Sequence, residues 1–325
     1  MMKPARKTYW HLGADRRLPS DYEIATSRLL THVARGGFAV NLPASEFYAR
    51  HQAGSRLASG RFDDFVDPRA TTYTRYVDLG REREAYVGRL LCSIEESHYD
   101  RELPPAWLDT LRRALSPLRF ACHGLQMLAA YVGQMAPSGR VAVAALFQCG
   151  DEIRRIQRLA YRLALLGRRD PEVAASGRAL WQSDPAWQPI RCAIEQLLVT
   201  YDWGEALVAL NLCLKPALDD LFLRQLADRA DGAGDHLDAQ ILRALLEDAA
   251  WHRAWTDALL ALAFADRAAN RQVVARWIDG WTPAVEAIAR AGGAILGNDL
   301  GSPGAEPPPP ARPHVDRPRD GGTLG

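Results

Sequence analysis

The segment CGDEIRRIQR, residues 149–158, contains Glu152, a carboxylate that could bind a metal ion together with a second ligand at helical spacing. Glu152 is followed three positions later by Arg155, and the neighbouring apolar residues recur at helical spacing. In di-iron carboxylate bundles the unit on such a helix is Glu-x-x-His, which puts a carboxylate and an imidazole on one helix face. Arginine stays protonated and has no lone pair to donate, so Arg155 cannot ligate iron.

Two interpretations of Arg155 follow from its neighbours. The first is that Arg155 pairs with Glu152 and Asp151, which precede it by three and four residues, and that this fixed cation replaces the charge of a metal. The second is a stripe of arginines exposed to solvent, because further arginines recur at intervals of four residues. These are Arg154, Arg158 and Arg162.

A second candidate ligand lies in the segment LLEDAAWHRAW. His252 could supply an imidazole, but the residue three positions earlier is Ala249, so this Glu-x-x-His unit is broken at its other end. Asp248 precedes His252 by four residues and could accept a hydrogen bond from it. We therefore expect a structural histidine here rather than a metal ligand.

One intact Glu-x-x-His unit, Glu95 to His98, lies at the end of an expected helix. It has no second unit to complete a ligand set, so a metal role is not favoured. Cys122 and His123 are adjacent, but neighbouring side chains on a helix diverge by about 100 degrees, so we expect core packing rather than a thiolate pair. No glycine-rich phosphate loop or Gly-x-Ser-x-Gly elbow is present in the sequence, so phosphate-binding and acyl-transfer functions lack support.

The composition narrows the class of protein. Of 325 residues, 48% are apolar and 24% are charged, and the net charge is +1, which gives no sign of attraction to nucleic acid or to anionic lipid. The five cysteines are widely spread, as expected of reduced thiols on apolar helix faces. We expect a cytoplasmic protein without a membrane span, because the sequence has no signal-like start and no run of about 18 apolar residues.

The spacing of apolar residues predicts an all-α fold, since alternating β-branched runs are scarce. Proline and glycine supply the breaks between helices, and Pro216 should kink the helix that contains it. A capping box at Ser20 and Glu23 begins an early helix that Gly36 and Gly37 should end. The longer helices are expected at residues 81–98, 104–115, 117–135, 139–167, 186–201, 203–230, 237–265 and 271–296.

The chain divides into three predicted parts. Residues 1–80 form an irregular N-terminal arm with short helices, residues 81–297 a helical domain, and residues 298–325 a tail rich in proline and glycine. The tail has almost no apolar side chains to offset its ordering entropy, so we expect it to be disordered. The arm is rich in aromatic residues, which protein interfaces favour, and we predict that it lies over a partner chain. The candidate contacts are Tyr9, Trp10, Tyr22, Phe65 and Tyr76.

Five segments between the N-terminus and residue 216 carry a family resemblance: KTYWHLG, PSDYEIATSRLL, FVDPRATTYTRYV, SPLRFACHGLQMLAAYVGQMAP and YDWGEALVALNLCLKP. They resemble the β subunit of the hydroxylase component of bacterial multicomponent di-iron monooxygenases, in the toluene and alkene monooxygenase group. The helical layout extends the resemblance to about residue 296.

The resemblance implies a ferritin-like helical bundle with extra helices, paralogous to a catalytic α subunit. It implies that the α subunit holds the di-iron centre and that α, β and γ chains form a two-fold αβγ assembly. An effector protein, a ferredoxin and an NADH reductase are the further implied partners. The implied reaction uses O2 and NADH-derived electrons to hydroxylate or epoxidise aromatic hydrocarbons or alkenes.

Carried over residue by residue, the resemblance leaves the ligand positions of the α subunit degenerate in this chain. At the first Glu-x-x-His unit this chain has Glu152 but Arg155 for histidine. At the second unit it keeps His252 but has Ala249 for glutamate. The two units are therefore broken at opposite ends.

The remaining ligand positions are also incomplete. Asp202 or Glu205 lies near another ligand position, whereas the first ligand helix, around Phe120 to His123, has no carboxylate. At most two or three potential ligands remain, too few for a di-iron centre.

The sequence thus predicts a non-catalytic, scaffolding β subunit without a metal or cofactor of its own. The alternative is a self-sufficient di-iron oxidase that uses Glu152, Glu205 and His252 with further ligands that the sequence does not place. A free-standing helical adaptor is a third class, which the resemblance disfavours. The hydrocarbon substrate, the electron donor and the role of the proline-rich tail are not identified by the sequence.

Overall fold

The computed structural model describes residues 20–26 and 42–297. Every regular element within these ranges is helical, which confirms the predicted all-α class. None of the described helices is long and apolar enough to cross a membrane. The α-helices are α1 (Asp21–Thr26), α3 (Leu42–Tyr48), α4 (Tyr73–Ser97), α5 (Pro105–Gln134), α6 (Gly139–Arg169), α7 (Pro171–Ala175), α8 (Gly177–Ser183), α9 (Gln188–Leu198), α10 (Trp203–Val208), α11 (Lys215–Asp219), α12 (Leu226–Gly232), α13 (His236–Asp266) and α14 (Asn270–Leu296). Short π or 3-10 segments are η1 (Ala49–Ala53), η2 (Phe62–Asp64), η3 (Tyr99–Glu102), η4 (Ala209–Leu214) and η5 (Asp220–Gln225).

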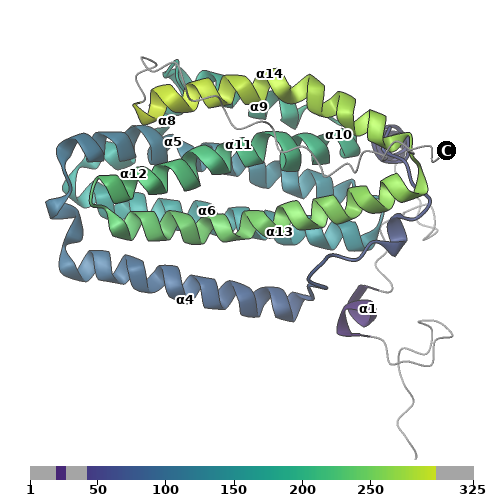
Figure 1. Cartoon of the computed structure of the whole chain (residues 1–325), viewed down its shortest axis with the longest axis horizontal. Coiled ribbons are helices and arrows are strands. Elements are labelled where there is room, and N and C mark those ends of the chain that lie inside the picture. The colour runs from purple at the N-terminus through teal and green to yellow at the C-terminus, as the bar shows by residue number, and fades with distance from the viewer. Residues whose placement is uncertain (1–19, 27–41, 298–325) are drawn as a thin grey trace, which may run out of the picture.

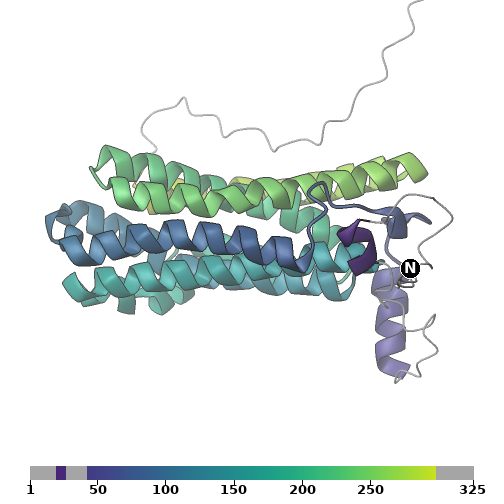
Figure 2. The ribbon, with the colours of Figure 1, turned by 90° about the horizontal axis from the view of Figure 1, so that it is seen from below.

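The long helices lie side by side along the long axis of the molecule (Figure 1). α5 and α6 are joined by a short turn and pack against each other, and α13 packs against α6 and α12. α4 covers α6 and α13 on one side of the bundle, as the view from below shows, and α14 packs on α9 and η4 on the other (Figures 1 and 2). The inward residues of these helices form one apolar core.

α5 is a single helix, although the sequence predicts a break between residues 115 and 117. Pro117 lies inside α5, where its ring removes the backbone hydrogen bond to the carbonyl of Arg113. The indole of Trp187 donates to that carbonyl at 2.9 Å, so the freed acceptor is satisfied from another helix. The prediction of two helices was wrong. The donor that replaces the lost backbone N–H belongs to Trp187, 70 residues beyond Pro117, so the sequence around the proline does not reveal it.

The segment from α10 to α12 is continuous and contains two π-helical stretches. η4 ends directly before Lys215, and Pro216 is the second residue of α11. η5 follows α11 directly. The irregularity near Pro216 is a widened π turn, η4, just before it in the chain. Turns of this kind often accompany functional sites.

Hydroxyl side chains cap the first turns of α4 and α6. Thr72 caps α4 by accepting from Arg75 N at 3.3 Å, and Ser138 caps α6 by accepting from Val141 N at 3.4 Å. Because α4 begins at Tyr73 rather than at residue 81, it runs through the predicted boundary at residue 80. The division into an arm and a helical domain stays a prediction.

The predicted capping box of α1 is present. Ser20 N donates to Glu23 Oε2 at 2.7 Å, and Glu23 N donates to Ser20 Oγ at 3.2 Å. The predicted end of this helix at Gly36 and Gly37 lies outside the described residues, as does the predicted disordered tail from residue 298.

Candidate functional site: a buried ring of ion pairs

Four charged side chains form a closed ring of ion pairs between α6 and α11. Glu152 contacts Arg155 Nη1 at 3.2 Å through Oε2 and Lys215 Nζ at 3.0 Å through Oε1. Asp219 contacts Arg155 Nη1 at 2.8 Å through Oδ1 and Lys215 Nζ at 2.6 Å through Oδ2. Each carboxylate therefore bridges both cations, with one oxygen toward each. We call these four residues the ion-pair ring.

The ion-pair ring lies deep in the bundle. Its four side chains are at most 7% exposed, and that of Glu152 is fully buried. From α13 the carbonyl of Leu245 accepts from Arg155 Nη2 at 3.3 Å. From α5, Cys122 lines a small void together with Arg155 and Asp219, and burial raises the pKa of its thiol to about 12. The ring is thus enclosed by four helices and faces a neutral thiol.

The charges of the ion-pair ring balance, with two cations and two anions. Burial alone would raise the pKa of Asp219, but Arg155 and Lys215 outweigh burial and hold that pKa below its usual range. Burial likewise acts to lower the pKa of Arg155, and the two carboxylates more than reverse this. Asp219 also receives directed hydrogen bonds from both cations, whereas Glu152 makes ion-pair contacts without a well-directed hydrogen bond. Glu152 is therefore held mainly by charge.

The predicted pairing of Arg155 is confirmed for Glu152 but was wrong for Asp151. Asp151 contacts Arg154 Nη2 at 3.4 Å and the imidazole of His252. The i,i+3 pair depends on helix geometry alone, whereas the second partner of Arg155 comes from another helix. Local spacing offered both Glu152 and Asp151 as partners of Arg155 and could not show that Asp219 of α11 is the second one.

The alternative of a solvent-exposed arginine stripe was wrong. Arg162 is 1% exposed and binds Asp100 and Asp238. The side chain of Arg154 is 14% exposed, and that of Arg158 is 24% exposed and pairs with Glu84. The stripe points toward α4 and α13 rather than toward water.

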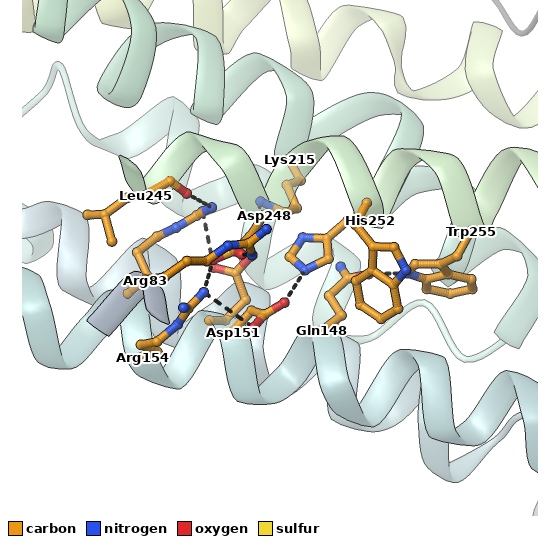
Figure 3. Close-up of polar contacts among 12 residues, drawn as sticks. Arg83, Gln148, Asp151, Arg154, Lys215, Leu245, Asp248, His252 and Trp255 are labelled. Carbon is orange, nitrogen blue, oxygen red and sulfur yellow. Dashed lines mark hydrogen bonds and ion pairs between the residues drawn. The ribbon is translucent and has the colours of Figure 1, made fainter. Parts of the chain in front are cut away.

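His252 is a hydrogen-bonded core residue, but its partner differs from the predicted one. Its Nε2 donates to Asp151 Oδ2 at 3.0 Å (Figure 3). Asp248 instead pairs with Arg83 and Arg154. Burial lowers the pKa of His252, which keeps the imidazole neutral, and the hydrogen bond to Asp151 counteracts this only in part. The structural role predicted for His252 agrees with this geometry, whereas the prediction of Asp248 as partner was wrong.

A neutral polar network continues from His252 along the core (Figure 3). Gln148 and Asn211 exchange hydrogen bonds of 2.7 and 3.1 Å, and Trp255 donates to Gln148 Oε1 at 3.0 Å. Asn211 also donates to Thr256 at 2.8 Å. These bonds join α6, which carries half of the ring, to η4 and α13.

A partly open cavity of about 210 Å³ reaches the ring from the surface. Lys215, Asp219, His252 and Ala249 line it. The small side chain of Ala249, where the resemblance implies a glutamate in the α subunit, supplies no ligand to this space. His252 Nδ1 has no hydrogen-bond partner among the described residues.

Asp202 and Glu205 have structural partners. Asp202 caps α10 by accepting from Gly204 N at 2.9 Å, and it also accepts from Ser55 Oγ at 2.6 Å. Glu205 accepts from Trp281 Nε1 at 3.2 Å. The structure does not bring these carboxylates into contact with Glu152.

The other candidate pairs are separate from the ring. Glu95 lies at the surface and accepts from Arg168 at 2.5 Å and from Tyr161 at 3.1 Å. His98 ends α4 in the left-handed conformation, with φ of 53°. Cys122 is buried and His123 is exposed, as expected for neighbours that point in different directions.

These residues do not fit a di-iron centre. Glu152 and Asp219 are each engaged by two cations, Arg155 cannot coordinate, and Ala249 has no donor. Over the described part of the chain there is no group of three or more His, Cys, Asp or Glu residues placed to hold a metal ion. The ring instead balances charge: the cations of Arg155 and Lys215 neutralise the buried carboxylates of Glu152 and Asp219.

Two of the predicted interface residues are not available to a partner. Tyr22 is 3% exposed and lies under the guanidinium of Arg140, 5.8 Å from its ring centre. Phe65 is 1% exposed and makes an edge contact with Trp255 at 6.4 Å. The prediction took them for surface residues, and this was wrong because the arm packs them onto its own chain.

The other three predicted interface residues are Tyr76, Tyr9 and Trp10. Tyr76 is half-buried and stacks on Phe147, with ring centres 4.5 Å apart. Tyr9 and Trp10 lie outside the described residues. A contact with a partner stays a prediction for these three residues.

Lys215 and Asp219 were not predicted as site residues. Their spacing of four residues would place both on one helix face, and they stand in a largely apolar run, ALVALNLCLKPALDDLFL. A lysine in such a run signals a buried cation that needs partners.

The Methane/Phenol/Alkene Hydroxylase family model matches residues 44–267, which is more than half of the chain. The chain belongs to this family. This family member is 32% identical over 306 residues to the hydroxylase component subunit beta of the toluene-4-monooxygenase system of Ectopseudomonas mendocina, with 92% of each chain covered. It is 28% identical over 227 residues to the oxygenase component DmpL of phenol 2-monooxygenase from Pseudomonas sp. strain CF600, covering 69% of this chain and 68% of that relative.

Solved structures show the same fold for this family member. A chain of toluene 4-monooxygenase, in a structure with toluene bound in the resting active site, aligns with a TM-score of 0.84 and 31% identity, covering 91% of this chain and 99% of that one. Phenol hydroxylase from Pseudomonas sp. OX1 aligns with a TM-score of 0.79 at 21% identity, which supports the fold alone. The predicted resemblance and helical fold are confirmed.

Proposed function

We propose that this chain is the non-catalytic β subunit of a multicomponent hydroxylase and scaffolds an iron-bearing α subunit. The observation that carries the proposal is the ion-pair ring. Its two side-chain cations engage both carboxylates between the core helices, which leaves neither carboxylate free for iron. The 32% identity to a hydroxylase β subunit supports the same role.

The rival function, a self-sufficient di-iron oxidase, needs Glu152, Glu205 and His252 as ligands. Each of these groups already has another partner: Glu152 is in the ring, Glu205 accepts from Trp281, and His252 donates to Asp151. His252 Nδ1 is open among the described residues, but freeing the two carboxylates would break contacts on both α6 and α10. The geometry therefore favours the scaffold.

The wider system is proposed from the relatives. The relatives are components of toluene and phenol monooxygenases, and the family model covers methane, phenol and alkene hydroxylases, so we propose aromatic hydrocarbons or alkenes as the substrates of the whole enzyme. The proposed partners are α and γ chains in a two-fold αβγ assembly, an effector protein, a ferredoxin and an NADH reductase. The proposed location is the cytoplasm.

An exposed apolar stripe on α5 and α6 is the proposed contact with the α subunit. It consists of Met127, Leu146 and Ile153, which are 44%, 53% and 43% exposed. The two helices pack closely here, since Leu146 lies 3.3 Å from where a side chain on Gly133 would begin. Neighbouring exposed apolar side chains of this kind mark protein interfaces.

The test is to purify the chain alone and in co-expression with an α chain of the same family from the same source, chosen for its two intact Glu-x-x-His units. We expect no iron in the chain alone and iron in the complex. With the remaining components of the system added, we expect hydroxylation only when both chains are present. Near-stoichiometric iron in the chain alone would contradict the scaffold and favour the rival oxidase. Failure of the two chains to co-purify would favour a free-standing adaptor.

A further inference from the structure

We propose that Lys215 keeps divalent metal out of this chain by filling, with its own ammonium group, a cation site between Glu152 and Asp219. The inference rests on the proposed function, in which this chain stays free of metal while its partner holds iron. It adds a residue that maintains this difference.

The contacts of Lys215 are those of a bound cation. Its Nζ lies 3.0 Å from Glu152 and 2.6 Å from Asp219, and these carboxylates come from two facing helices. Two carboxylates with water are a ligand set that hard divalent cations accept. Glu152 is fully buried and both of its oxygens lack a well-directed hydrogen bond, so another cation of suitable size could satisfy it equally well.

The residue type at this position is also unusual for the chain. Among 40 basic residues only three are lysines, and the other two are Lys3 and Lys7. An ammonium group is a compact point charge, whereas a guanidinium is a planar fork. The one lysine of the helical bundle therefore stands where a compact cation is needed.

The cation site between Glu152 and Asp219 can be approached from one side, through the partly open cavity. Lys215 and Asp219 line the cavity of about 210 Å³, and the unpartnered His252 Nδ1 belongs to a residue of the same lining. Shortening Lys215 to alanine would extend this cavity to Glu152. A hydrated ion could then reach both carboxylates.

The charge balance explains why the wild-type chain would refuse a metal. With Arg155 and Lys215 present the ring is neutral, so an added divalent ion would bring two uncompensated charges into a buried site. Without Lys215 the ring carries one net negative charge. A divalent ion is then attracted rather than excluded.

The experiment compares full-length wild type, Lys215→Ala and the double variant Glu152→Gln/Lys215→Ala, each with and without Mn²⁺. We expect Lys215→Ala to lower the Tm by roughly 5–15 °C and saturating Mn²⁺ to recover at least half of that loss. Loss of the free Mn²⁺ EPR signal should give one ion per chain. The double variant, in which Arg155 and Asp219 balance, should be less destabilised and should not respond to Mn²⁺.

Two controls separate charge from metal chemistry. Lys215→Arg keeps the charge and should bind no Mn²⁺. Arg168→Ala removes a surface cation, whose side chain is 65% exposed, and should leave both Tm and Mn²⁺ binding unchanged. If Lys215→Ala is insoluble, its soluble yield should rise when cells are grown with added Mn²⁺.

Several results would overturn the inference. One is a folded Lys215→Ala chain that binds no Mn²⁺ or responds no more than the double variant does. An insoluble Lys215→Ala chain whose yield Mn²⁺ does not raise is a second. Stoichiometric Mn²⁺ binding by the wild type that Glu152→Gln abolishes is a third. Iron that persists in a Glu152→Gln chain purified alone would instead contradict the proposed function, because it is bound outside the ring, so the two failures are distinguishable.

Discussion

α6 carries two buried charge clusters that use arginine in different ways. In the ion-pair ring, Arg155 and Lys215 share two carboxylates, and Glu152 lacks directed hydrogen bonds. Seven residues further along, Arg162 makes four hydrogen bonds to two aspartates. We call this second cluster the arginine clamp: Arg162 with Asp100 and Asp238, at distances of 2.5–2.9 Å.

The difference between the two clusters concerns geometry. The arginine clamp uses the planar fork of one guanidinium, which matches two carboxylates and has no simple substitute. The ion-pair ring is held more by charge balance, so a different cation could take part in it. The clamp is therefore a structural tie, whereas the ring is a site whose occupant can be exchanged.

The largest effect is expected from breaking the arginine clamp. Arg162→Met leaves Asp100 and Asp238 buried without their cation, so the free energy of unfolding should fall by about 3–5 kcal/mol. Urea unfolding followed by circular dichroism measures this. Arg168→Met, which removes an exposed arginine from the same helix, is the control and should change little. A loss below about 1 kcal/mol for Arg162→Met would remove the distinction between clamp and ring.

A smaller loss is expected when Arg155 is removed from the ring. In Arg155→His, Lys215 still contacts both carboxylates, so the free energy of unfolding should fall by about 2–3 kcal/mol. The variant should bind no iron, because Lys215 still occupies the carboxylates and Ala249 still has no donor. Metal analysis of the purified variant checks this, and one or more irons per chain would show that Arg155 alone excludes iron.

The pH dependence near the ring should follow His252. Its folded pKa lies below its ordinary value of about 6.5, so between these two values the unfolded chain binds more protons. The free energy of unfolding should therefore fall as the pH drops below 6.5, by up to about 1.4 kcal/mol per pH unit. Urea titrations at pH 7.5, 6.5 and 5.5 measure the slope. His252→Gln, which can still donate to Asp151, should flatten it, and an unchanged slope would assign the effect to other groups.

The pH dependence near the clamp should have the opposite sign. Burial and the neighbouring Asp238 raise the pKa of Asp235 to about 8, well above its ordinary value. The folded chain then holds a proton that the unfolded chain has lost, so stability decreases as the pH rises between about 4 and 8. Asp235→Asn should lose this decrease, which amounts to about 2 kcal/mol between pH 6 and 8. Equal slopes for the variant and the wild type would contradict the protonated state.

The smallest effect on stability is expected at the apolar stripe, away from both clusters. Leu146→Arg should change the free energy of unfolding by less than about 0.5 kcal/mol, because Leu146 is 53% exposed. It should nevertheless reduce co-purification with the α subunit at least tenfold. Val199→Arg, at an apolar position that is 61% exposed near the end of α9, is the matched control. Equal recovery of both variants would show that the stripe is not the contact.

The sequence predicted those features that depend on neighbours along the chain. The capping box at Ser20 and Glu23 and the pair of Glu152 with Arg155 were both predicted, because three residues along a helix place the groups within reach. The continuity of α5 through Pro117 was not predicted, because its replacement donor is Trp187. The same reason applies to His252, whose partner Asp151 lies on another helix.

By itself the sequence determined the all-α class and the loss of a ligand set, since helical periodicity and the absence of donors at residues 155 and 249 are properties of residue type and spacing. Only the tertiary structure decided what took the place of the ligands. It brings Lys215 and Asp219 of α11 against α6 and buries all four charges together. An ion pair between helices depends on their packing and on the π turns that flank α11, and neither can be read from the spacing of residues along one helix.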